Sequence, residues 1–120
     1  MRTDEIIARA TALGLPIAEN EFRKTKETPL PDPPYLIWFE DGKHGTGADN
    51  AVLFVEKKIV LELYTDKIAD EAIEQKIEQQ VLYDTEYRKY QALIQNEDLV
   101  QTAYEFTVLE KLPKGARKYG

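Results

Sequence analysis

The chain has 120 residues, 42% of them hydrophobic, and a formal net charge of −6 at pH 7. This length predicts one domain with a real core, and the absence of cysteine excludes disulfides and cysteine-based metal or nucleophile chemistry. No basic-then-apolar segment opens the chain, and no apolar run approaches the ~20 residues that span a bilayer. We therefore expect a soluble protein without a signal peptide or a membrane partner.

The charge is unevenly distributed along the chain. The first 110 residues carry twelve bases and all twenty-two acids, whereas the last ten carry four bases and no acid. An acidic body repels a phosphate backbone, so we expect no specific nucleic-acid binding by the globular part. The composition predicts a single domain over residues 1–112 and a basic, flexible tail over 113–120.

The beginning of the chain predicts a short helix. Thr3 is a candidate N-cap, acids follow it, and Gly14 suits the left-handed residue that ends many helices. Pro16 then prevents continuation. The helix is too short to be stable alone in water, so its apolar face must dock on the rest of the domain. That face consists of Ile6, Ile7, Ala10 and Leu13.

Residues 17–40 lead into a sheet. A short edge strand and an ordered loop are both open for 17–26. Four prolines within 28–34 favour an extended conformation, which we interpret as a stiff connector rather than a proline-rich docking ligand. The five apolar residues 35–39 predict a strand that is buried on both faces.

The stretch 41–50 is rich in glycine. Its order Gly-x-x-Gly-x-Gly matches neither a P-loop nor a dinucleotide-binding loop, and a further strand rather than a helix follows it. We expect a mobile hairpin loop of about ten residues that carries contacts to a partner.

Residues 52–65 predict either one long strand or two short ones. The period changes at Asp66, where apolar residues begin to recur at helical spacing up to Leu82, with Thr65 or Asp66 as the N-cap. The polar face of this helix, expected to be solvated, carries Lys67, Glu71, Glu74, Gln75 and Glu78.

The segment 83–96 fits a helix or a strand. We prefer a strand over 86–94 that pairs as a hairpin with 100–108, where apolar and polar residues alternate clearly. The predicted fold is α+β: a mixed, mostly antiparallel sheet of about four to five strands with two helices packed on it, in the order α-β-β-α-β-β.

Catalytic or metal chemistry is not indicated. His44 is the only histidine and has no cysteine partner, so it makes a poor metal ligand. The oxygens of Asp41, Asp49 and Asn50 do not follow the spacing of a calcium loop. No nucleophile and base can be paired, and we therefore expect no enzyme and no cofactor.

Several stretches together resemble a known family. They are Leu15-Pro16-Ile17-Ala18, Asn20-Glu21-Phe22, Pro33-Pro34-Tyr35-Leu36-Ile37, a Gly/Asp-rich loop ending Ala48-Asp49-Asn50, Val60-Leu61-Glu62-Leu63-Tyr64-Thr65-Asp66 and Gln101-x-x-Tyr104-Glu105-Phe106. They resemble the small tail-terminator (tail-completion) proteins of long-tailed phages and Gram-positive prophages, over most of residues 1–110.

The resemblance implies an α+β fold and a structural role without catalytic residues. Such proteins form a ring, typically a hexamer, at the end of the tail tube, where the ring stops polymerisation and offers a surface to the head connector. The implied partners are further copies, the tube protein and the connector. The implied location is the head-proximal end of the virion tail, and the host cytoplasm during assembly.

Three segments are candidates for the assembly contacts, because extended arms and loops can supply a ring interface. Their residues are Asp41, Lys43, His44, Thr46, Asp49 and Asn50 in the glycine-rich stretch, Leu30 and Asp32 in the connector, and Lys114, Arg117 and Lys118 in the tail. Two alternatives stay open: a head-completion or head–tail joining protein, and a monomeric acidic protein-binding module of the inhibitor type.

Overall fold

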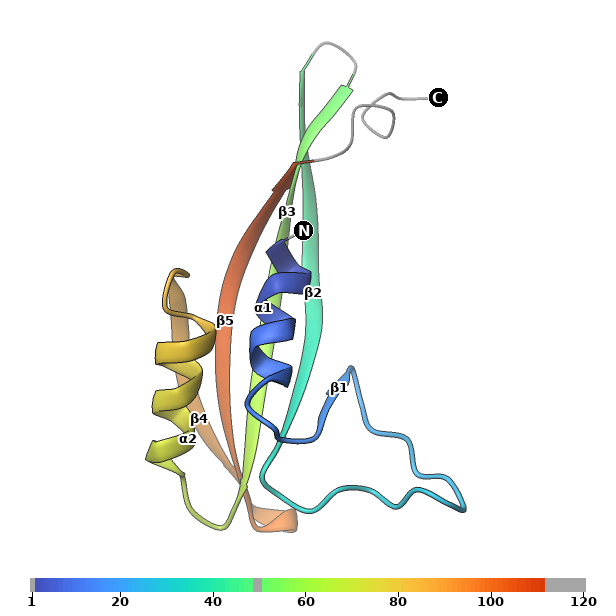
Figure 1. Ribbon diagram of the computed structural model, residues 1–120, viewed down its shortest axis with the longest axis vertical. Helices are drawn as coiled ribbons and strands as arrows, with labels where there is room; N and C mark the ends of the chain where they lie inside the picture. The colour runs from blue at the N-terminus through green and yellow to red at the C-terminus, as the bar shows by residue number, and fades with distance from the viewer. Residues whose placement is uncertain (1, 49–50, 112–120) are drawn as a thin grey trace.

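The computed structural model describes residues 2–48 and 51–111 and confirms the α+β class (Figure 1). Two helical segments pack on a five-stranded sheet of order β1-β2-β3-β5-β4. One short strand, β1, adds to the expected order. The elements are α1 (Arg2–Thr11), β1 (Ile17–Glu19), β2 (Tyr35–Ala48), β3 (Ala51–Asp66), α2 (Glu71–Lys76) with the π-helical turn η1 (Ile77–Val81), β4 (Tyr87–Ile94), the 3-10 turn η2 (Gln95–Glu97) and β5 (Leu99–Lys111).

The sheet is antiparallel except at one edge. β1 runs parallel to β2, whereas β2–β3, β3–β5 and β5–β4 are antiparallel. β3 is the central strand, and its 16 residues form one unbroken strand. The predicted hairpin of β4 and β5 is confirmed, with Tyr87 opposite Phe106 and Ile94 opposite Leu99.

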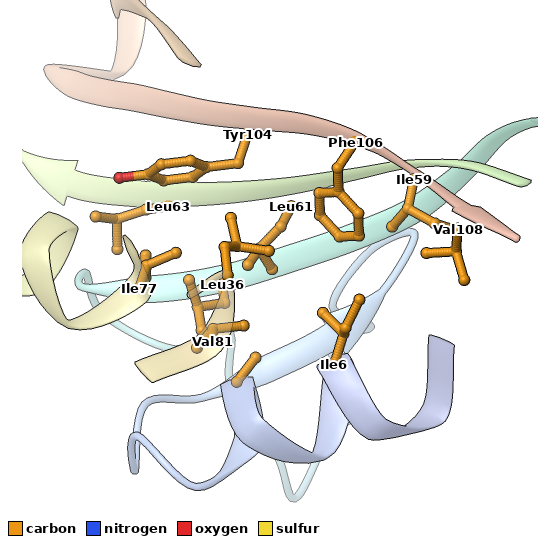
Figure 2. Close-up of a cluster of buried hydrophobic side chains, with 12 residues drawn as sticks. Ile6, Leu36, Ile59, Leu61, Leu63, Ile77, Val81, Tyr104, Phe106 and Val108 are labelled. Atoms are coloured by element: carbon orange, nitrogen blue, oxygen red, sulfur yellow. The ribbon is translucent and has the colours of Figure 1, made fainter. Parts of the chain in front are cut away.

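The hydrophobic core lies between the helices and one face of the sheet (Figure 2). Ile6 from α1 and Ile77 and Val81 from η1 point toward Leu61 and its neighbours on β3 and β5. Burying each such side chain contributes about 1.5–3 kcal/mol, which is what stabilises helical segments this short. Among residues 2–48 and 51–111, no helix lies on the sheet's other face, which we call the open face.

The helix-free face corrects the expectation for residues 35–39. Leu36, which points to the helices, is fully buried, but Tyr35, Ile37 and Phe39 on the open face are only half-buried. A continuous apolar run therefore does not imply here that the strand is covered on both sides.

The ends of α1 agree only partly with the sequence. Gly14 has the predicted left-handed conformation, with φ of +86°. Thr3, however, lies inside the helix rather than at its cap, and its backbone N–H donates to the Glu110 carboxylate over 3.1 Å. A carboxylate from β5 thus takes over part of the capping that a serine or threonine usually provides.

The predicted start of the second helix is wrong by several residues. Asp70, not Thr65 or Asp66, is the N-cap and accepts from the N–H of Ile73. Thr65 is buried, and its hydroxyl donates to the Ile68 carbonyl instead. Lys67 adopts a left-handed conformation, which interrupts any helix begun at Asp66.

The glycine-rich loop is also a wrong prediction. Residues 41–48 belong to β2 and pair with β3, from Gly42 opposite Lys58 to Ala48 opposite Ala51. The register shifts at two points, between Glu40 and Gly42 and between Thr46 and Gly47, and glycine is well suited to such bulges. Asp49 and Asn50 lie outside the described residues.

We call the outer part of this hairpin, 41–48 and 51–58, the arm. Its outer end projects beyond α1 and beyond the end of β5 (Figure 1). The radius of gyration is 16.7 Å, whereas a compact domain of this length has about 14 Å. The principal extents of 52 × 35 × 26 Å likewise describe an elongated molecule.

Gly14→Ala tests the end of α1. No heavy atom lies within 4 Å of an added Cβ, so the cost is one of backbone conformation, about 1–2 kcal/mol in the free energy of unfolding. The matched control is Gly42→Ala, whose Cβ would meet only the Lys58 Cβ at 4.0 Å. Urea unfolding should show Gly42→Ala to be near neutral, and equal losses for both variants would contradict the assignment.

Candidate functional site

One edge of the sheet is open along the arm. The N–H of Leu36 and the carbonyl of Trp38 bond to the segment that holds β1, so alternate residues of β2 direct their backbone groups outward. The register with β3 shows which β2 residues come next in this alternation. The backbone groups of Glu40, Lys43 and Gly45 point away from β3. β1 pairs with β2 only as far as Trp38, and no other described strand lies beside residues 40–48.

The opposite edge is β4, whose outer side is unpaired in the described part of the chain. The same alternation directs the backbone groups of Tyr87, Lys89, Gln91 and Leu93 away from β5. Residues 88–93 are exposed, and Leu93 is 59% exposed. An edge of this length with unpaired N–H and C=O groups is a template for pairing with another strand.

β5 continues past the beginning of β4. The pairing of these strands starts at Tyr87 and Phe106, so the outward groups of Thr107 and Leu109 have no β4 residue beside them. An open groove of about 440 Å³ lies here, and both basic and acidic side chains line it. The lining residues are Arg2, Lys58, Asp84, Thr85, Glu86, Tyr87, Arg88, Glu105, Phe106 and Thr107. Its mixed charge does not single out one class of small ligand.

The structure gathers four of the predicted contact residues on the arm. Asp41, Lys43, His44 and Thr46 are exposed side chains of β2. Lys43 lies opposite Lys57 on the helix side of the sheet, whereas His44 and Thr46 lie on the open face, opposite Glu56 and Phe54. These residues therefore form two surfaces of one strand.

The remaining predicted residues are elsewhere. Leu30 and Asp32 belong to the segment between β1 and β2, which loops out at the end of the molecule opposite to the arm (Figure 1). Leu30 lines a groove there with Phe22, Pro31, Tyr35 and Ile37. The connector and the arm thus form separate surfaces. Asp49, Asn50, Lys114, Arg117 and Lys118 lie outside the described residues.

A polar cluster around the buried Glu74 joins α2 and η1 to β4. The ammonium of Lys89 lies 2.7 Å from both Glu74 and Glu78, and the Tyr104 hydroxyl donates to Glu78 over 2.7 Å. Glu74 is only 4% exposed, so the expectation of a solvated helix face is wrong for it. The signal in the sequence was weak: Tyr87, Lys89 and Gln91 share one face of an alternating strand.

The pKa values in this cluster follow from burial and pairing. Burial raises the pKa of Tyr104 well above its ordinary value, and the charge of Glu78 adds to this. Burial would raise the pKa of Glu78 as well, but hydrogen bonds from Lys89 and Tyr104 outweigh it and lower that pKa. Burial would lower the pKa of Lys89, but the hydrogen bonds to Glu74 and Glu78 outweigh burial and raise that pKa. The arrangement keeps Glu78 and Lys89 charged and fixes β4 to the helices.

Two further groups of ion pairs hold α1. Lys57 at the base of the arm lies 2.8 Å from Glu110, which also accepts from Thr3. At the other side, Asp84 binds Arg9 at 2.9 Å and Arg2 at 3.2 Å. The hydrogen bond from Arg9 holds the pKa of Asp84 well below its usual range. These contacts connect α1 to the arm and to the beginning of β4.

The open face has its own hydrogen-bonded group. Glu62 accepts from the Tyr64 hydroxyl at 3.0 Å and from the Gln101 amide at 2.7 Å. Burial raises the pKa of Glu62, and burial beside this carboxylate raises the pKa of Tyr64 to about 12. Tyr64 also stacks on Tyr35, with ring centroids 5.1 Å apart. The group orients side chains across three strands, but it has no nucleophile.

Among residues 2–48 and 51–111, no three or more histidine, cysteine or acidic side chains are grouped so as to hold a metal ion. No described helix has the length and apolarity needed to cross a membrane. Comparison of the chain with protein-family models and with curated proteins finds no match.

Lys89→Met tests the buried cluster. The substitution leaves two carboxylates without their counter-ion, and we expect a loss toward the lower end of about 3–5 kcal/mol in the free energy of unfolding. The control is Lys76→Met, an exposed lysine of α2, which should change stability by less than about 0.5 kcal/mol. If denaturant unfolding gave similar midpoints for both, the cluster would contribute nothing to stability.

Glu110→Gln tests the link between α1 and the arm. Although burial raises the pKa of Glu110, hydrogen bonds from Lys57 and Thr3 outweigh it and lower that pKa below the ordinary 4.5. The unfolded chain then binds more protons at low pH, so the stabilisation is present above pH 4.5 and is lost as the pH falls through the lowered pKa. We expect the variant to be about 1–3 kcal/mol less stable at pH 7.

The difference between the parent chain and Glu110→Gln should shrink as the solution is acidified, as measured by urea unfolding from pH 7 to pH 3. Glu71→Gln, at an exposed acid of α2, is the control and should track the parent chain at each pH. A constant difference across this range would rule out the lowered pKa.

Proposed function

We propose that the protein is a structural assembly protein that closes a phage tail tube. Copies form a ring on the end of the tube, stop its polymerisation and present a surface to the head connector. The ring is taken to be a hexamer, as in the family that the sequence resembles. The partners under this proposal are further copies, the tube protein and the connector, at the head-proximal end of the virion tail and in the host cytoplasm during assembly.

The observation that carries the proposal is the pair of unpaired edges on opposite sides of one sheet. The edge of β2 along the arm and the outer edge of β4 are different surfaces. Association through two different surfaces is heterologous, and it continues from copy to copy until rotation closes a ring. Exposed edges of this length are a liability for an isolated protein.

The segments that carry the sequence resemblance also build this sheet. The stretch 15–18 contributes the Pro16 carbonyl, which accepts from the N–H of Leu36 in the stretch 33–37 over 2.8 Å. In the last two stretches, Gln101 donates to the Tyr64 hydroxyl over 2.8 Å. The resemblance therefore concerns residues that support one another in the fold.

The acidic body fits this role. A net charge of −6 keeps unassembled copies soluble and away from the DNA phosphates. The elongated arm provides reach beyond the core of the subunit, where contacts to a neighbour or to the tube can be made without disturbing the buried cluster.

The test is a tube-capping experiment with purified tail-tube protein. Tubes polymerised alone should show a broad length distribution in negative-stain electron microscopy. Added protein should shorten the tubes and leave a ring on one end. Lys43→Glu on the arm should raise the concentration needed for capping about tenfold, which corresponds to 1.4 kcal/mol. The charge-matched control Lys76→Glu on α2 should cap like the parent chain.

A protein that forms no rings and does not bind tube ends would refute the proposal. Binding to the connector before any tail is attached would instead support a head-completion role. A strictly monomeric protein that captures a nucleic-acid enzyme would support the acidic binding module.

A further inference from the structure

We infer that β4 of one copy pairs antiparallel with the free edge of β2 on the arm of the next copy, with Tyr90 opposite His44. The occupant of each edge is thus a second copy of this chain. The inference rests on the proposed ring and names the interface that builds it.

Strand direction supports this pairing. Three successive antiparallel pairings separate β2 from β4, so these strands run in opposite directions within one sheet. Rotation about a ring axis preserves the orientation of every copy relative to that axis. The β4 edge of one copy therefore meets the β2 edge of its neighbour in the antiparallel sense, which is the more stable ladder.

The outlines of the two edges are complementary. β4 has eight residues and is the outermost strand of the sheet, next to β5. The unpaired stretch of β2, 40–48, is of similar length, and it is bounded on one side by β1, whose pairing ends at Trp38. A strand of eight residues spans about 27 Å, so β4 fits beside this unpaired stretch of β2. Because this stretch of β2 and β4 lie at different heights along the sheet, closing the ring requires the strands to tilt relative to the ring axis, as in closed barrels.

The alternation of backbone groups restricts the register, because residues whose backbone groups point outward must lie opposite each other. Outward groups face each other when Lys89 is opposite Gly45 and Gln91 is opposite Lys43. Tyr90 and His44 are then directly opposite in a pair without backbone hydrogen bonds, where side chains approach most closely. Arg88 lies opposite Thr46. No like charges lie opposite each other in these pairs, and Lys89 lies opposite Gly45.

The pairing also accounts for apolar surface. Tyr90 is 51% exposed and Leu93 59% exposed, on opposite faces of β4. A neighbouring strand covers part of both. A two-fold pairing of β4 with β4 would cover them too, but it would leave the β2 edge of each copy unpaired. Only the head-to-tail arrangement satisfies both edges with one kind of contact.

Disulfide cross-linking tests the register, because the chain has no cysteine of its own. Tyr90→Cys protein is mixed with His44→Cys protein at high micromolar concentration, oxidised mildly and run on a non-reducing gel. We expect a cross-linked dimer at least ten times more abundant than in a mixture of Tyr90→Cys with Leu109→Cys, an exposed open-face position on β5. A chain with both Tyr90→Cys and His44→Cys should give a ladder of covalent multimers.

The pair Arg88→Cys and Thr46→Cys is the second test of the same register, and it serves if either first variant fails to fold. Three results would overturn the inference: no cross-link from either pair, equal cross-linking with Leu109→Cys, or efficient self-cross-linking of Tyr90→Cys alone, which indicates a two-fold β4 dimer. Cross-linking without tube capping refutes the proposed function and leaves this interface standing. Capping by a protein that does not cross-link refutes the interface alone.

Discussion

Every strand needs hydrogen-bond partners on both sides, and this need determines which edges of the sheet are satisfied and which are not. β3 meets that need within the chain from Phe54 to Tyr64, because β2 pairs with it on one side and β5 pairs with it on the other. The flanking strands are shorter than the strands they flank. β1 covers three residues of β2, and β4 stops where β5 continues. The unequal strand lengths leave unpaired backbone at two opposite edges, and the proposed assembly uses these edges.

Charged side chains fix the short helices at defined points on this sheet. Glu110 connects the beginning of α1 to Lys57 at the base of the arm, and Lys89 connects β4 to Glu74 of α2. Such buried pairs add little net stability compared with apolar packing, but an unpaired member is costly, so they define which arrangement of the elements is tolerated. β4 is thereby held as a firm edge, and the arm is anchored at its base.

Local patterns predicted the elements well where local physics decides them. The alternation in Val100–Val108, the preference for a strand over 86–94 and the left-handed Gly14 are all present in the structure. Predictions failed where partners distant in sequence decide. Thr65 bonds to Ile68 and does not cap a helix, and Glu74 is buried beside a lysine fifteen positions later. The glycines of residues 41–48 do not form a loop, since pairing with β3 and bulges at the register shifts hold them in a strand.

The sequence by itself determined the α+β class, the order of the main elements and the absence of cysteine chemistry, because periodicity, capping and composition are local properties. It also predicted that Lys43, His44 and Thr46 contribute to assembly contacts, and this stays a prediction. Only the tertiary structure decided that this segment is a strand with an open edge, and that β4 presents the other edge across the sheet. The reason is physical. The position of an edge depends on which strands pair and on where their pairing stops. Both depend on a register that joins residues far apart in the chain.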